Sequence, residues 1–125
     1  MNFFKRRRIF KQANFLDLIP VRVLGHETRE DGGITLLMPR FKNRINSALF
    51  QPNTKEKIIY IKLDRFGGHT WLLIDGNSTV TEICDQLKTQ FPEELQSLDE
   101  TEDRVTKFLS LLYQQRYITF REIQD

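Results

Sequence analysis

Apolar and polar positions along the first part of the chain favour short strands. Residues 21–28 and 34–39 are two runs enriched in β-branched residues, and the stretch REDGG at 29–33 separates them. Glycine after aspartate supplies the positive backbone dihedrals of a tight reversal, so this pattern predicts a β-hairpin. Residues 58–63, IIYIKL, are almost entirely β-branched, aromatic or aliphatic and predict a third strand.

This third strand is expected at one edge of a three-stranded antiparallel sheet. Successive side chains of a strand point to opposite faces, so every second residue shares an environment. We expect Ile59, Ile61 and Leu63 to lie on the buried face and the alternate residues on the other. A register shift of one residue would exchange the two sets.

The hydrophobic period then becomes helical. Apolar runs at 71–74 and 80–87 flank the stretch DGNS, which predicts the end of one helix and the start of another. Gly76 can adopt the left-handed conformation that closes a helix. Thr79 and Glu82 have the spacing of a capping box for the next helix.

A third helix is predicted from residue 99 to about 115, where Asp99 and Glu102 have the spacing of a second capping box. A wide apolar face on this helix comprises Val105, Phe108, Leu109, Leu111, Leu112 and Tyr113. Residues 117–120 are again extended and can return to the sheet. The predicted fold is α+β: a three-stranded antiparallel sheet followed by three helices, like a winged helix-turn-helix.

The chain of 125 residues fits one domain. We divide it into a flexible basic arm at 1–13, a domain at 14–120 with an irregular insertion at 40–57, and a tail at 121–125. The arm contains Lys5, Arg6, Arg7 and Arg8, whereas residues 76–125 have ten acids against five bases. Three interpretations of the arm compete: a solvated terminus, weak contact with an anionic membrane surface, or contact with nucleic acid or an acidic protein.

Candidate chemistry is sparse in this sequence. His26, His69 and Cys84 are isolated from one another, so no metal site is predicted. We expect no catalytic residue and no cofactor, because no nucleophile has an evident base and orienting partner. A single cysteine, no secretory signal and no apolar segment of about 20 residues favour a cytoplasmic protein.

A winged-helix nucleic-acid-binding protein that uses the basic arm is the alternative function. The first turn of the third predicted helix, however, carries Asp99, Glu100, Glu102 and Asp103. Phosphates would repel these carboxylates where a recognition helix meets DNA. The charge pattern therefore argues against DNA as the partner of this helix.

An ordered set of short motifs resembles a known family. LDRFG at 63–67, WLLIDG at 71–76, TVTEI at 79–83 and the apolar run from Phe108 to Ile118 are similar to the PqqD family, named for a protein of pyrroloquinoline quinone biosynthesis. With the hairpin and IIYIKL, the resemblance spans about residues 18–120. The basic arm, the insertion at 40–57, and Arg116 where a helix-ending glycine is common depart from a minimal member.

The resemblance implies a non-enzymatic adaptor, a RiPP recognition element. Such an adaptor binds the leader segment of a ribosomally made precursor peptide as an added strand and presents it to a modifying enzyme, often a radical SAM protein. The peptide-binding residues that it implies here are Ile58, Ile59, Tyr60, Ile61, Lys62, Val105, Phe108, Leu109 and Leu112. Taken singly, each of the helix residues fits a core role better. An exposed edge strand also allows a homodimer.

Overall fold

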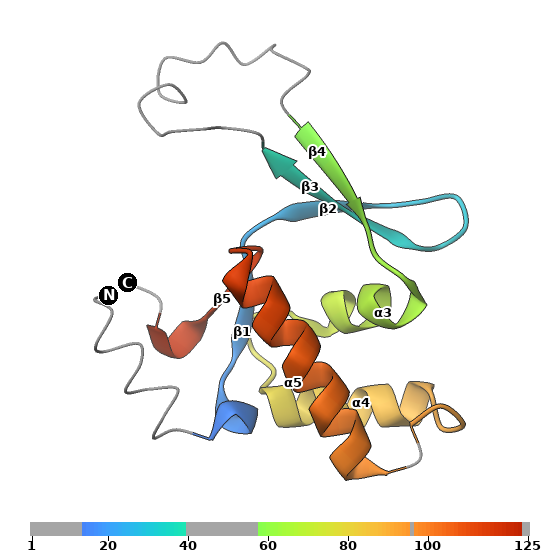
Figure 1. The fold of residues 1–125 in the computed structure, drawn as a ribbon, viewed down its shortest axis with the longest axis vertical. Helices are drawn as coiled ribbons and strands as arrows, with labels where there is room; N and C mark the ends of the chain where they lie inside the picture. The colour runs from blue at the N-terminus through green and yellow to red at the C-terminus, as the bar shows by residue number, and fades with distance from the viewer. Residues whose placement is uncertain (1–13, 40–57, 96, 124–125) are drawn as a thin grey trace.

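The computed structural model describes residues 14–39, 58–95 and 97–123 (Figure 1). Its elements in chain order are η1 (Phe15–Asp17), β1 (Pro20–Arg22), β2 (Gly25–Thr28), β3 (Ile34–Pro39), β4 (Ile58–Lys62), α3 (Arg65–Leu73), α4 (Val80–Gln90), α5 (Leu98–Gln114), β5 (Ile118–Phe120) and η3 (Arg121–Ile123). A three-stranded antiparallel sheet and three helices confirm the predicted α+β class. The predictions for the basic arm and the insertion lie outside the described residues.

The three-stranded sheet has the order β2-β3-β4, so β4 is at an edge, as predicted. Leu36 in the central strand is fully buried and lies opposite Ile61 of β4. The predicted hairpin joins β2 to β3. Its turn is closed by a 2.7 Å hydrogen bond from the Arg29 amide to the Gly33 carbonyl, and Gly32 has a φ of 85°.

The single strand predicted at 21–28 is wrong, because these residues form two strands in two sheets. β1 pairs with β5, with Val21 opposite Thr119, whereas β2 pairs with β3. β5 therefore pairs with β1 and not with the three-stranded sheet. The amides of Val23 and Leu24 both donate to the Tyr117 carbonyl, at 2.9 and 3.4 Å. This shared acceptor interrupts the ladder and turns the chain from one sheet into the other.

The helix, turn and helix order of residues 65–90 is confirmed. Thr79 and Glu82 form the predicted capping box, since the Glu82 amide donates to Thr79 Oγ1 at 3.2 Å and the Thr79 amide to Glu82 Oε1 at 2.8 Å. In the turn, Asp75 Oδ1 accepts hydrogen bonds from the backbone amides two and three residues ahead, which lowers the pKa of its carboxyl. Gly76 has a φ of 81°, but it lies within this turn, because α3 already ends at Leu73.

The predicted start of the third helix is wrong, because its N-cap lies two residues earlier than Asp99. Ser97 is the N-cap of α5, because its Oγ accepts a 3.1 Å hydrogen bond from the Glu100 amide. Serine is as good an N-cap as aspartate. Ser97 precedes Asp99 in sequence, so the helix starts earlier than a box at Asp99 allows.

The core lies between the sheet and the helices and is centred on Trp71, which is fully buried. Its indole Nε1 donates a 3.1 Å hydrogen bond to Nδ1 of His26 in β2. Arg22 donates from its guanidinium to the carbonyls of Trp71 and Leu72, at 3.2 and 3.0 Å. The bond to Leu72 satisfies a carbonyl of the last turn of α3, whereas the Trp71 carbonyl also accepts a 3.1 Å hydrogen bond from the Ile74 amide.

Arg116 ends α5 in a left-handed conformation, with a φ of 67°. The Tyr117 amide donates to the Leu112 carbonyl and the Arg116 amide to the Tyr113 carbonyl, at 2.9 and 3.0 Å. This is the bonding pattern of a Schellman motif, in which glycine is the usual left-handed residue.

We predict that Arg116→Gly raises the free energy of unfolding by ~1 kcal/mol, because it removes the steric cost of a left-handed non-glycine residue. The matched control is Lys107→Gly, an exposed position in the middle of α5, which should lower stability by roughly 0.5–1 kcal/mol. Urea denaturation of both variants measures the two changes. A loss of stability in Arg116→Gly would contradict the strain assigned to this position.

Candidate functional site

The free edge of β4 is the first component of the candidate site. The Leu63 amide donates to the Ile34 carbonyl at 2.9 Å, so the pair of Ile34 and Leu63 is hydrogen-bonded. Bonded and non-bonded pairs alternate along an antiparallel ladder. The register of β3 and β4 therefore turns the N–H and C=O groups of Ile58, Tyr60 and Lys62 away from β3. No described strand pairs with this side of β4.

The side chains of β4 follow the predicted alternation. Ile59 and Ile61 are half-buried, and Ile61 packs against the core. On the other face, Ile58 is 43% exposed and Tyr60 is 60% exposed, and Lys62 is also exposed. The edge thus combines apolar side chains on both faces with backbone groups that have no strand partner among the described residues.

The α5 residues implied by the family resemblance divide into two groups. Val105, Leu109 and Leu112 have 0–2% exposure and belong to the core, so they present no surface to a peptide here. Phe108 is half-buried and lies at the margin of the core. Whether any of these residues contacts a peptide stays a prediction.

The peptide-binding set implied by the resemblance leaves out two exposed residues of α5 near Phe108. Arg104 and Leu111 are exposed, with 52% of Leu111 accessible, and both lie three or four positions from Phe108. Residues at this spacing share one side of a helix. Helical periodicity could have identified this stripe if the apolar face had been divided into its centre and its margin.

Two glycines place α5 beside the start of α3. A Cβ at Gly67 would lie 3.2 Å from the Phe108 ring, and a Cβ at Gly68 would lie 3.3 Å from Cγ1 of Ile34. These distances are tighter than ordinary carbon contacts. The glycine pair therefore allows close packing of α3 against both α5 and β3.

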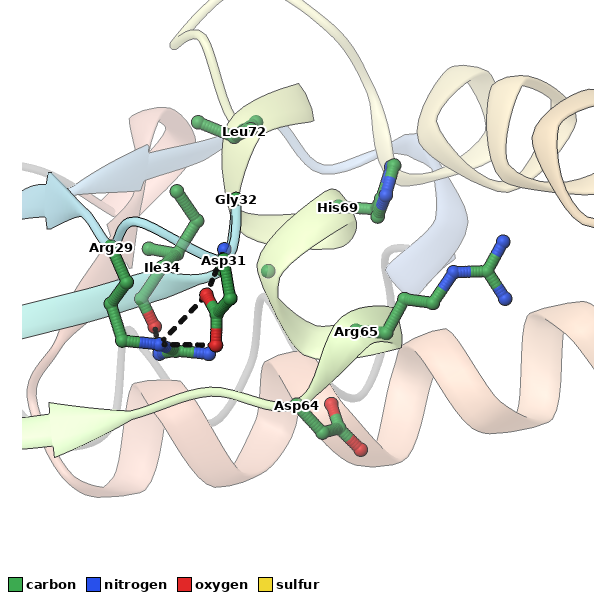
Figure 2. A pocket seen from close by; sticks show the side chains of 10 residues that line it. Arg29, Asp31, Gly32, Ile34, Asp64, Arg65, His69 and Leu72 are labelled. Carbon is green, nitrogen blue, oxygen red and sulfur yellow. Dashed lines mark hydrogen bonds and ion pairs between the residues drawn. The ribbon is translucent and has the colours of Figure 1, made fainter.

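Arg29 connects the hairpin turn to the end of β4. Its Nη1 donates to the Ile34 carbonyl at 2.7 Å, its Nη2 donates to the Leu63 carbonyl at 3.3 Å, and its Nε pairs with Asp31 at 3.3 Å. Figure 2 shows this cluster beside a pocket of about 480 Å³ between the turn and α3. The Arg29 guanidinium is thus occupied by structural bonds within the protein.

Catalytic chemistry finds little support in residues 14–39, 58–95 and 97–123. No three His, Cys, Asp or Glu side chains gather there as metal ligands would. His69 Nδ1 is hydrogen-bonded to Gln90 Oε1 at 3.0 Å, and burial raises the pKa of the Cys84 thiol to about 12. No helix of the described part is long and apolar enough to cross a membrane.

The fold and the edge define a small α+β binding domain. The family model described as coenzyme PQQ synthesis protein D (PqqD) matches residues 48–118, which is more than half of the chain. The chain therefore belongs to the PqqD family. No curated protein and no solved structure matches it.

Members of the PqqD family share a general role. Proteins of this family are non-catalytic accessory proteins that bind a precursor peptide and a partner enzyme in PQQ synthesis. The matched residues contain β4 and all three helices, and so the whole candidate site. Neither the fold nor the match supports the nucleic-acid alternative.

We predict that Arg29→Ala lowers the free energy of unfolding by about 1–2 kcal/mol, because the part-buried carbonyl of Leu63 loses a charged donor. The Leu63 amide should also exchange its hydrogen faster, because it lies at the end of the ladder that Arg29 holds. Glu30→Ala, an exposed change in the same turn, is the control and should stay within about 0.5 kcal/mol. Equal exchange rates in both variants would show that Arg29 does not hold β4.

Proposed function

We propose that this protein is a non-enzymatic adaptor that binds the leader segment of a ribosomally synthesised precursor peptide by strand addition. The leader pairs with the free edge of β4 and is presented to a modifying enzyme, for which a radical SAM protein is the leading candidate. The observation that carries the proposal is the row of outward backbone groups at Ile58, Tyr60 and Lys62. Unpaired edge groups of this kind are what an extended peptide recognises.

The two faces of the edge supply side-chain recognition. A leader residue opposite Ile59 or Ile61 would point to the inner face, where Ile61 packs against the core. A residue opposite Ile58 or Tyr60 would point to the outer face, where both side chains are exposed. Cross-strand pairs on one face interact directly, so apolar leader residues are favoured on both faces.

Burial narrows the proposed contact set. We assign direct peptide contact to the five residues of β4 and to Phe108, and we add Leu111. Val105, Leu109 and Leu112 are buried and hold α5 in the core, so they contribute to the site indirectly. Replacing one of them would lower peptide affinity because it would destabilise the fold.

The remaining predictions concern the setting of this function. A second copy of the chain would compete with the leader for the same edge, so a homodimer formed through β4 would be inhibitory. The cytoplasm is the compartment where precursor peptides are made, and we propose that the protein acts there. The basic arm stays a candidate for weak membrane-surface contact.

We predict that titration with the leader segment of a precursor peptide encoded beside the gene shifts the backbone amide resonances of residues 58–62 most. The Phe108 and Leu111 region of α5 should shift next, whereas η1 and the exposed residues of α4 should change little. Nuclear magnetic resonance of the labelled full chain measures these shifts. Shifts restricted to the basic arm would contradict strand addition.

A proline substitution separates backbone pairing from side-chain contact. Tyr60→Pro removes an outward N–H while leaving the bonds from β4 to β3 intact, because Pro is tolerated on the free side of an edge strand. We expect the leader affinity to fall about tenfold or more, since a pairing bond is lost and the ring obstructs the edge. Tyr60→Val keeps the N–H and should lose less affinity. Equal losses in the two variants would contradict backbone recognition.

A further inference from the structure

A hollow of about 250 Å³ follows the end of β4. Its lining comes from three parts of the chain: the start of α3, the connection after α4, and α5. The lining residues are Asp64, Arg65, Phe66, Phe91, Glu94 and Arg104. No step of the proposed strand addition uses this hollow.

Two arginines at the hollow lie over aromatic rings. The guanidinium carbon of Arg104 lies 4.2 Å from the centre of the Phe66 ring, and that of Arg65 lies 4.6 Å from the centre of the Phe91 ring. In Figure 2, Arg65 points away from Arg29 and Asp31, toward the opposite side of α3. Stacking restricts each guanidinium and leaves its N–H groups free to bind a carboxylate in the plane.

The four charged groups of the hollow differ in how fully they are engaged. Asp64 caps α3, because its Oδ1 accepts a 2.7 Å hydrogen bond from the Gly67 amide. Arg65 pairs with Glu94 at 3.2 Å, and both side chains are more than half exposed. Arg104 has no carboxylate within ion-pair distance among the side chains that the structure describes. The hollow therefore has one engaged cation and one available cation.

The position of the hollow relates it to β4. Asp64 lies two residues after the last residue of β4, and Phe66 packs against Phe108 with their ring centres 6.5 Å apart. An extended chain advances by about 3.3 Å per residue. A leader paired along β4 and continuing past Lys62 would thus reach Arg104 roughly two to four residues later.

Backbone pairing alone fixes neither the direction nor the register of the leader along β4. An edge strand can accept a peptide in either direction, and a shift of two residues restores the same pattern of bonds. A charged contact at one end of the edge removes both ambiguities. Bidentate pairs between arginine and carboxylate add such geometric specificity.

We propose that the stacked pair Arg104 and Arg65 is the binding site for an acidic side chain of the leader, placed just beyond the segment that pairs with β4. This inference rests on the proposed function and adds to it the charge, direction and register of the leader. Arg104 makes the principal contact. Arg65 contributes when Glu94 releases it.

The test is a selection from a random peptide library displayed on phage, with the full-length chain as bait. We expect enriched peptides to carry alternating apolar residues with Asp or Glu within about four positions of one end of that segment, and at the same end in every peptide. Replacing that acid by its amide should weaken binding about fivefold in synthetic peptides. Nuclear magnetic resonance then establishes whether each peptide shifts the amides of residues 58–62.

Variants of the arginines and of a matched cation assign the effect. R104Q should abolish the acid preference, and R104K should retain part of it, because lysine keeps the charge but not the planar stack. K107Q makes the same charge change one turn along α5, outside the hollow, and should preserve the preference. E94Q should strengthen it by freeing Arg65. The three side chains changed in these four variants are exposed, so the fold should be retained.

The possible outcomes distinguish a failure of the acid-binding inference from a failure of strand addition. Peptides that shift the amides of residues 58–62 without an acid preference would overturn this inference and leave strand addition intact. An acid preference that R104Q retains, or that K107Q removes equally, would show a general charge effect and also overturn it. A selection that enriches no peptide acting at residues 58–62 would overturn strand addition and this inference together.

Discussion

The close approach of α3 to its two neighbours is the constraint on which the rest of the structure depends. Gly67 and Gly68 are consecutive, and each lacks the side chain that would collide with a different element: Phe108 of α5 on one side and Ile34 of β3 on the other. α3 follows β4 after only two residues, so the packing of α3 also positions the end of β4. A larger residue at Gly67 would push α3 away from α5, and one at Gly68 would push it away from β3. The glycines therefore act on the candidate site through packing alone.

Short sequence patterns predicted the helices and strands. How these elements pair and pack depends on contacts between residues that are distant in the chain. The β-branched run of β4 and the capping box at Thr79 depend on residues within four positions, so the sequence was sufficient for both. The division of residues 21–28 depends on the Tyr117 carbonyl, almost a hundred residues away, which no local pattern reveals. The cap of α5 was missed for a different reason. Ser97 and Asp99 are both good caps, and sequence alone does not choose between overlapping frames.

The candidate site was also predicted only in part, because local patterns reveal the faces of a strand but not which side of a helix its neighbours cover. Alternation in a strand fixes which residues share a face, so the two faces of β4 were correct. A wide apolar face on a helix contains a covered centre and an accessible margin, and periodicity does not separate them. Val105 and Leu109 lie at the centre and Phe108 at the margin, because α4 covers one side of α5 more fully than α3 covers the other. Arg29 and Arg104 look like ordinary surface cations in sequence, since the carbonyls and rings that hold them are distant along the chain.

The buried and the exposed residues of α5 have different roles, and this difference bears on how the domain could bind one peptide in preference to others. Its buried residues maintain the fold, so they cannot change without a cost in stability. In the proposed strand addition, the edge of β4 would supply affinity with little discrimination, because every extended peptide can satisfy its backbone groups. Discrimination must then come from exposed side chains near the edge, on the margin of α5 and at the start of α3. Arg104 and Leu111 meet this condition, because both are exposed and neither belongs to the core. Residues of this kind can alter the preferred peptide while the scaffold beneath them stays unchanged.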